Sequence, residues 1–118
     1  MGINSKDNMT ASALALRDSL RVLQRQLSLP QLVALLTIHS NPGLSVNDLA
    51  ETLDVPQQSA SRHVAFLAGR YQNELSEIPP KAFVTQQINP NDPRSRALHL
   101  TDEGAALIRQ LLQSTVSS

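Results

Sequence analysis

Polar side chains of the kind that read DNA bases are gathered in one short segment. The segment holds, in order, Gln57, Gln58, Ser59, Ser61 and Arg62. The surrounding stretch 55–73 has two arginines, one histidine and no acidic residue. Glutamine can form two hydrogen bonds with adenine and arginine two with guanine in the major groove, while serine bonds phosphates or base edges. A merely solvated surface would more often carry Glu and Lys, so we interpret these residues as base-reading candidates.

Two further arginines lie in a segment dense in turn-forming residues. The sequence Asn-Pro-Asn-Asp-Pro-Arg-Ser-Arg occupies 89–96, and turns favour Asn, Asp and Pro. Arginine fits the narrow minor groove of A·T-rich DNA, so we predict that Arg94 and Arg96 contact that groove. Asp92 could pair with Arg94 and fix its direction. The alternative is an exposed ion pair that only stabilises the turn, by less than about 1 kcal/mol.

A third group of arginines has a simpler interpretation. Arg17, Arg21 and Arg25 recur every four residues, which places them on one face of a helix. A solvated face is the favoured interpretation because like charges at this spacing mildly repel each other. Contact with phosphate or with an acidic partner is the alternative.

The sequence gives poor support to catalysis. It lacks a nucleophile elbow, a glycine-rich phosphate loop and a His-Glu-x-x-His pattern. The three histidines are far apart, and the absence of cysteine excludes a zinc finger and a cysteine nucleophile. We therefore expect no catalytic residues, no metal and no cofactor.

Composition indicates a single globular domain. A chain of 118 residues with 41% hydrophobic residues has the size and apolar content for one core. Ten basic residues balance ten acidic ones, so any attraction to nucleic acid must be local. No apolar run approaches the roughly 20 residues of a membrane span, and the first residues lack an apolar signal core. We expect a soluble, cytoplasmic protein.

Helix signals precede the base-reading candidates. Apolar spacing predicts a helix over about 10–26, with Leu16, Leu20, Leu23 and Leu27 on one face. Ser28 and Pro30 predict the start of a central helix that ends at 41–43. A Ser-x-x-Asp capping box at 45–48 starts a short third helix. The break at 54–56 leads into a fourth helix, whose inner face is predicted to be Ala60, Val64, Leu67 and Tyr71. The last two helices form a helix-turn-helix.

Strand signals follow. The run 83–88 is rich in β-branched and aromatic residues, and 96–100 alternates, so they predict a hairpin around the 89–93 turn. Thr101 caps a final helix whose apolar face is Leu107, Ile108, Leu111 and Leu112. The expected fold is mainly α, a winged helix-turn-helix domain at 10–113, with a flexible arm at 1–9 and a frayed end at 114–118.

These motifs resemble those of MarR-type winged-helix regulators. The resemblance rests on Leu-Ser-Val-Asn-Asp-Leu-Ala-Glu-Thr-Leu-Asp-Val-Pro at 44–56 and the following residues to 62, on the Asn-Asp-Pro-Arg-Ser wing, and on Leu-Thr-Asp-Glu-Gly at 100–104. It implies that the helix 57–68 reads bases in the major groove. It also implies that Arg94 enters the minor groove and that Asp92 orients it. Pro56 replaces the usual helix cap, the link from Leu67 to Phe83 is longer than in the family, and both chain ends are shorter.

We therefore predict a homodimeric repressor that binds palindromic double-stranded DNA. The expected dimer interface comprises Leu16, Leu20, Leu23, Leu107, Leu111 and Leu112. The family often binds small aromatic effectors, but the short end helices and the few aromatics argue against such a pocket here. Two alternatives remain open: a phage or plasmid accessory protein for replication or recombination, and a winged helix used for protein–protein contact.

Overall fold

A computed structural model describes residues 5–69 and 82–115 of the chain, with side chains for 8–69 and 82–113. Its elements, in order, are α1 (Ser5–Leu23), α2 (Leu29–Ser40), α3 (Val46–Leu53), α4 (Gln57–Leu67), β1 (Val84–Asn89), β2 (Asp92–Leu100) and α5 (Asp102–Thr115). The helix-rich winged architecture predicted from the sequence is confirmed. The predicted extension of the fourth helix to Tyr71 lies outside the described residues.

Two capping boxes set the starts of α2 and α3. The Ser28 hydroxyl accepts from the backbone N–H of Gln31, and the Gln31 side chain accepts from the N–H of Ser28. Ser45 and Asp48 make the same reciprocal pair at 3.0 and 3.1 Å. Each box satisfies two backbone donors that the first turn of a helix leaves unpaired, so both helices begin where the sequence predicted.

α1 begins earlier and ends earlier than predicted. The apolar spacing predicted about 10–26, whereas the helix runs from Ser5 to Leu23. Neither proline nor glycine occurs between residues 3 and 29, so nothing in the sequence stops the helix from starting before its apolar stripe. The predicted flexible arm at 1–9 therefore overlaps the first turn of α1. At the other end α5 continues to Thr115, one residue into the segment expected to fray.

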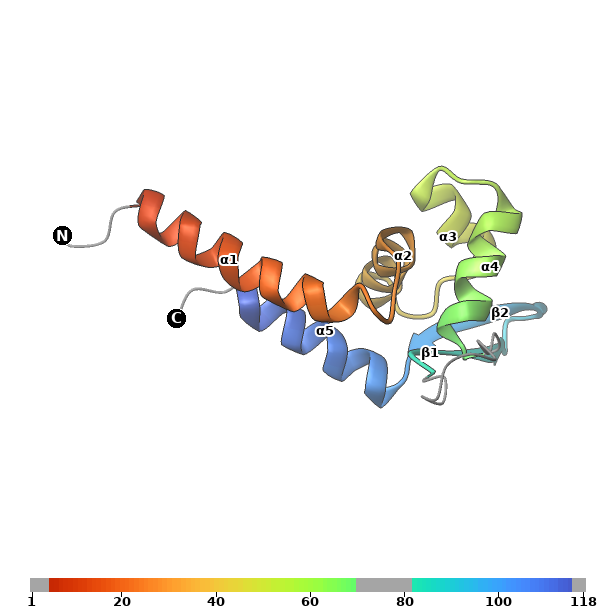
Figure 1. Ribbon diagram of the computed structural model, residues 1–118. Helices are drawn as coiled ribbons and strands as arrows, with labels where there is room; N and C mark the ends of the chain where they lie inside the picture. The colour runs from red at the N-terminus through yellow and green to blue at the C-terminus, as the bar shows by residue number, and fades with distance from the viewer. Residues whose placement is uncertain (1–4, 70–81, 116–118) are drawn as a thin grey trace.

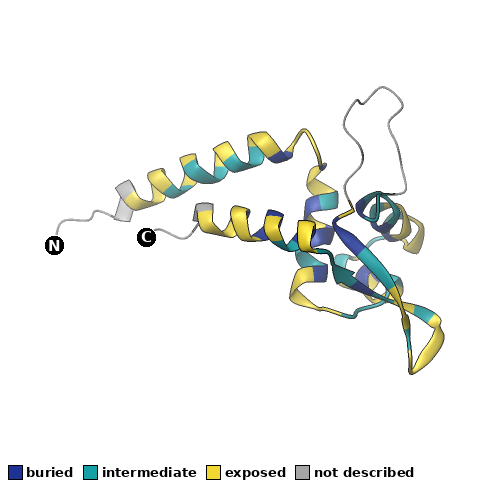
Figure 2. Cartoon of the chain, turned by 90° about the horizontal axis from the view of Figure 1, so that it is seen from below, coloured by how far each residue is buried: buried dark blue, intermediate teal, exposed yellow. Residues whose placement is uncertain are grey.

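The core lies between α2, the helix-turn-helix and the base of the hairpin (Figure 2). α2 passes through its centre, with Leu35 fully buried and Ile38 nearly so. α4 contributes Ala60 and Leu67, and β2 contributes Leu98, all with no exposed surface. The apolar side chains of α2, α4 and β2 therefore point inward, as their helical or alternating spacing predicts.

α1 and α5 form an arm that projects from this core. The two helices run antiparallel, side by side, away from the helix-turn-helix (Figure 1). The molecule is consequently elongated, with extents of 57 × 36 × 25 Å and a radius of gyration of 16.4 Å. A compact chain of this length would have a radius of gyration of about 13 Å. In the described residues no helix is both long and apolar enough to cross a membrane.

Candidate nucleic-acid interface

The turn between α3 and α4 presents α4 at the surface. Asp54 adopts a left-handed conformation (φ 54°, ψ 49°), and the next N–H, that of Val55, donates to the Ala50 carbonyl at 3.0 Å. Aspartate tolerates this region better than most residues with a Cβ. α4 then begins at Gln57 without a side-chain cap, because Pro56 cannot supply one. The Pro56 carbonyl instead accepts from the N–H groups of Ser59 and Ala60.

α4 separates an apolar inner face from a polar outer face. Ala60, Val64 and Leu67 are at most 1% exposed and fix the helix against the core. The outer face carries the predicted base-reading residues. Of these, Gln57, Gln58, Ser61 and Arg62 are exposed and Ser59 is half-buried. Gln58 and Arg62 lie one helical turn apart, so both can enter one groove.

The hairpin is longer than the sequence predicted. β2 begins at Asp92 rather than near Arg96, and a register irregularity follows Ile88, so that Asn89 pairs with Asp92. Side-chain oxygens satisfy backbone donors at the tip: Asn89 accepts from the N–H of Asn91 at 2.9 Å, and Asp92 accepts from the N–H of Arg94 at 3.1 Å. These bonds let the ladder continue almost to the tip, although Pro93 has no N–H to contribute.

The contact that Asp92 makes differs from the expected one. Its carboxylate was predicted to pair with the Arg94 side chain, but it accepts from the backbone N–H of that residue. Within the described residues a salt bridge joins Arg17 to Asp18 on α1, at 2.9 Å and exposed to solvent. Asp92 therefore shapes the turn that carries Arg94, and the guanidinium is exposed at the tip.

Hydrogen bonds hold the hairpin base against the helices. The N–H of Phe83 donates to the carbonyl of Leu67, the last residue of α4, at 2.7 Å. Thr101 donates its N–H to Phe83 and its hydroxyl to Ala82, and accepts from the N–H of Gly104 as the cap of α5. The sequence predicted this cap but not its bonds to the hairpin. They fix the wing relative to α4 and α5.

A second anchor joins the opposite edge of the hairpin to the loop after α2. Leu98 donates its N–H to the Leu44 carbonyl and accepts from the N–H of Gly43, at 2.9 and 2.8 Å. Gly43 has a φ of 90°, a conformation that suits glycine in this tight turn. Both strand edges near the base are thereby fixed to the core, and only the outer half of the hairpin extends freely.

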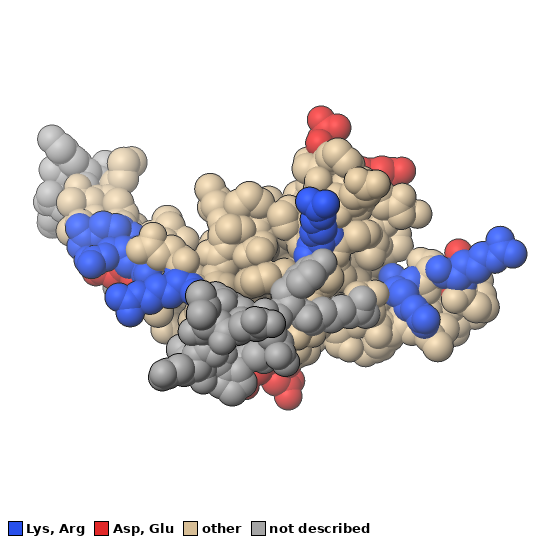
Figure 3. Space-filling view, turned by 45° about the vertical axis from the view of Figure 1, so that its right-hand side comes forward, with Lys and Arg blue, Asp and Glu red and all other residues tan. Residues whose placement is uncertain are grey.

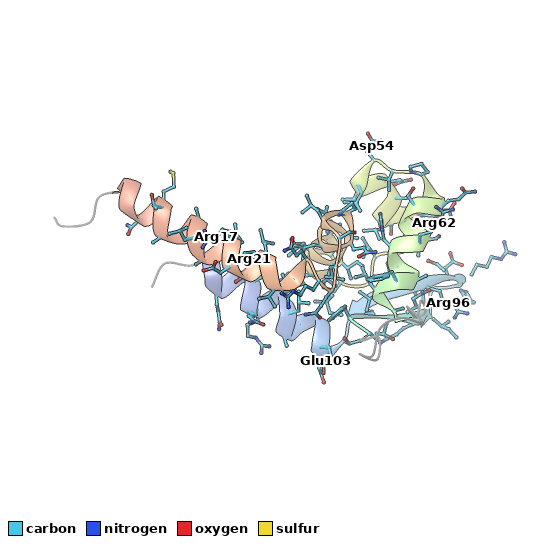
Figure 4. The ribbon with its side chains drawn as sticks, viewed as in Figure 1. Arg17, Arg21, Asp54, Arg62, Arg96 and Glu103 are labelled. Atoms are coloured by element: carbon cyan, nitrogen blue, oxygen red, sulfur yellow. The ribbon has the colours of Figure 1, made fainter. Side chains whose placement is uncertain are left out.

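Basic side chains gather at the end of the molecule formed by α4 and the hairpin. Arg62 and Arg96 lie at this end, whereas Asp54 lies at the upper edge, in the α3–α4 turn (Figure 4). The space-filling view shows blue side chains toward the hairpin and red ones along the top, together with a second blue group over α1 at the left (Figure 3). A chain of zero formal net charge thus carries a local positive surface, which attracts phosphates within a Debye length of about 8–10 Å.

The predicted interface leucines are partly used within the chain. Leu23, Leu107 and Leu111 are at most 9% exposed, because α1 and α5 pack on each other and on the core. Leu16 and Leu20 are half-buried and line a groove of about 480 Å³ between α1 and the start of α2. Leu112 is 45% exposed. The arm is therefore only partly covered by its own chain.

The helix-turn-helix part of the chain is similar to known proteins. A model described as the MarR family matches residues 25–69, from the end of α1 through α4. The HTH-type transcriptional regulator PetP of Rhodobacter capsulatus is 32% identical over 77 residues, which is 65% of this chain and 40% of that protein. The chain thus spans less than half the length of this curated relative.

Solved structures share the fold over most of the chain. A mutant MarR from E. coli, complexed with operator DNA, superposes with a TM-score of 0.66 at 22% identity, covering 92% of this chain and 68% of that one. The PcaV transcriptional regulator from Streptomyces coelicolor, in complex with its natural ligand, gives a TM-score of 0.60 at 24% identity, covering 75% and 55%. At these identities the likeness concerns the fold.

Proposed function

We propose that this chain, which resembles the MarR family of winged helix-turn-helix regulators over residues 25–69, binds double-stranded DNA sequence-specifically as a homodimeric repressor. The observation that carries the proposal is the common orientation of α4 and the hairpin, which present exposed arginines at one end of the molecule (Figure 4). α4 is an exposed helix of the size that enters a major groove. The hairpin tip would reach the adjacent minor groove.

The fixed base of the wing supports these separate roles for α4 in the major groove and the hairpin in the minor groove. Hydrogen bonds from Phe83 and Leu98 fix the hairpin to α4 and to the loop after α2. Two reading elements bind one duplex more tightly when their spacing is held before binding, because ordering them on binding costs affinity. The chain is similar in fold to a MarR structure solved with operator DNA, which supports the same use of the fold here.

Exposed apolar surface on the arm supports assembly into a dimer. Among described residues the strongly exposed large apolar side chains, apart from Ile88, are Met9, Leu14, Val22, Leu29, Val33 and Leu112. All lie on α1, α2 or α5, and none lies on the helix-turn-helix. A second copy seated on the arm could cover those that lie on α1 and α5. The contact would be isologous about a two-fold axis.

A dimer also answers the requirement for specificity. One winged helix reads only a few base pairs, which is too little information to find one site in a genome. Two copies on a palindrome, with half-sites about 10 base pairs apart, double the sequence that is read. Occlusion of a promoter by such a dimer is the repression mechanism that needs no further domain.

Selection of bound duplexes from a random pool tests the proposal. We expect one enriched palindromic family and, by light scattering at tens of micromolar, a dimer before DNA is added. The matched control is Arg109→Ala, which removes an exposed arginine from α5 and should select the same sequence. Failure to enrich any duplex would refute DNA binding and favour a protein-binding winged helix. An enriched site without two-fold symmetry, bound by a monomer, would refute the dimer.

A further inference from the structure

Ile88 is a large apolar side chain at a place where packing within the chain does not explain it. It lies on β1 one residue before the irregularity at the hairpin tip, and 63% of its surface is exposed. Isoleucine suits a strand, but a side chain left this exposed gains little from the hydrophobic effect on folding. The other strongly exposed large apolar residues of the described chain lie on α1, α2 and α5.

The register shows which way Ile88 faces. Ile88 pairs directly with Arg96, and directly opposed side chains share one face of an antiparallel pair. Alternation along the strands places Val84 and Leu98 on this same face, where both are at most 1% exposed against the core. Ile88 and Arg96 therefore extend the core-facing side of the hairpin past the edge of the helices. That side opens onto the end of the molecule where Arg62 projects from α4 (Figure 4).

From this placement we propose that Ile88 packs into the minor groove and makes the wing prefer A·T over G·C base pairs. The inference rests on the proposed function and adds a contact that carries sequence information. In the minor groove a G·C pair differs from an A·T pair by the 2-amino group of guanine, which is a hydrogen-bond donor. An isoleucine against this group would leave the donor without an acceptor, and an unmade bond of this kind is costly.

The neighbouring charges favour DNA over a protein partner. Arg96 stands opposite Ile88, and Arg94 lies two residues nearer the tip, both exposed. The acidic residue of the two strands, Asp92, accepts a hydrogen bond from the backbone N–H of Arg94. An exposed apolar side chain on a hairpin that also carries two exposed arginines fits a groove with negative walls and an apolar sugar surface. The arginines would bind any narrow groove, and Ile88 would reject the guanine amino group inside it.

An inosine·cytosine pair is a G·C pair that lacks the 2-amino group of guanine. Duplexes with inosine therefore isolate the effect of that amino group on binding. The probe is the duplex selected by the wild-type chain, with its flanking pairs made all A·T, all G·C or all inosine·cytosine. The wild type should bind the A·T and inosine duplexes alike and the G·C duplex more weakly. Ile88→Thr keeps the β-branch and should lose about three- to tenfold affinity on the first two, but less than about twofold on G·C. The control Gln87→Thr changes an exposed neighbour on the opposite face and should match the wild type.

Several results would overturn the inference. An Ile88→Thr variant that discriminates the three duplexes as the wild type does would show that groove width, and not Ile88, sets the preference. An equal loss on all three duplexes would show a contact without sequence information, and a lowered melting temperature would assign the loss to folding. A wild-type chain that binds none of the duplexes would instead refute the proposed function itself.

Discussion

Replacing Arg62 by alanine should weaken specific DNA binding without destabilising the fold. The side chain is exposed on the outer face of α4, and alanine is the best helix former. The free energy of unfolding should therefore change by no more than about 0.5 kcal/mol. A bidentate contact between arginine and guanine contributes about 1–3 kcal/mol of discrimination. The expected loss of affinity is thus about 5- to 150-fold for each half-site, and a dimer on the selected palindrome should lose the product of two such factors.

Fluorescence anisotropy with the selected and a scrambled duplex measures both parts of this effect. Arg62→Ala should weaken binding to the selected duplex far more than to the scrambled one, and a repeated selection should relax one position per half-site. Gln58→Ala, one turn away on the same face, should also relax a position but leave the salt dependence unchanged, because it removes no charge. Arg109→Ala on α5 is the control for charge alone.

If Arg62→Ala selected the wild-type sequence with wild-type affinity, Arg62 would not read a base. If Arg109→Ala lost as much affinity as Arg62→Ala, the effect would follow net charge and not position. In either case another face of the molecule would have to read the bases.

The remaining predictions concern the wing, its anchor and the arm. Arg94→Ala should weaken binding to duplexes with A·T-rich flanks and leave the melting temperature unchanged. Asp92→Ala should weaken the same binding to a smaller extent, because it loosens the turn that carries Arg94. Wild-type affinity in Arg94→Ala would count against a wing that binds the minor groove. Gly104→Ala should lower the unfolding free energy by about 1–3 kcal/mol in a denaturant titration, since a methyl group there would overlap the Phe83 carbonyl oxygen; an unchanged midpoint would contradict this packing. Leu112→Asp should give a folded monomer by light scattering that has lost high-affinity binding, and a dimer of unchanged affinity would exclude Leu112 from the interface.

Local signals predicted the parts of the fold that depend on a few neighbouring residues. The Ser28 and Ser45 capping boxes and the turn residues at 89–93 each act within a span of a few residues. Their physical effect is complete within that span, so the sequence states it directly. Apolar spacing likewise identified the inner face of α4, including Ala60 and Leu67.

Features that depend on distant partners could not be predicted in the same way. The bonds of Phe83 and Thr101 to separate elements and the antiparallel pairing of α1 with α5 join residues far apart in sequence. The start of α1 at Ser5 was missed because apolar spacing marks the buried face of a helix and not its ends. Ile88 was counted only as a strand former, since its exposure depends on how far the hairpin extends past the core.

A salt titration of duplex binding by the wild-type chain tests the central claim, that a local basic surface on α4 and the wing binds DNA despite zero net charge. The three exposed arginines Arg62, Arg94 and Arg96 can each release about one phosphate counterion. For two chains on one duplex, the logarithm of the binding constant should fall against the logarithm of salt with a slope of about −5. The Arg94→Ala, Arg96→Ala double variant should reduce that slope to about −2. Binding that is insensitive to salt, or a slope that both variant and wild type share, would contradict the account.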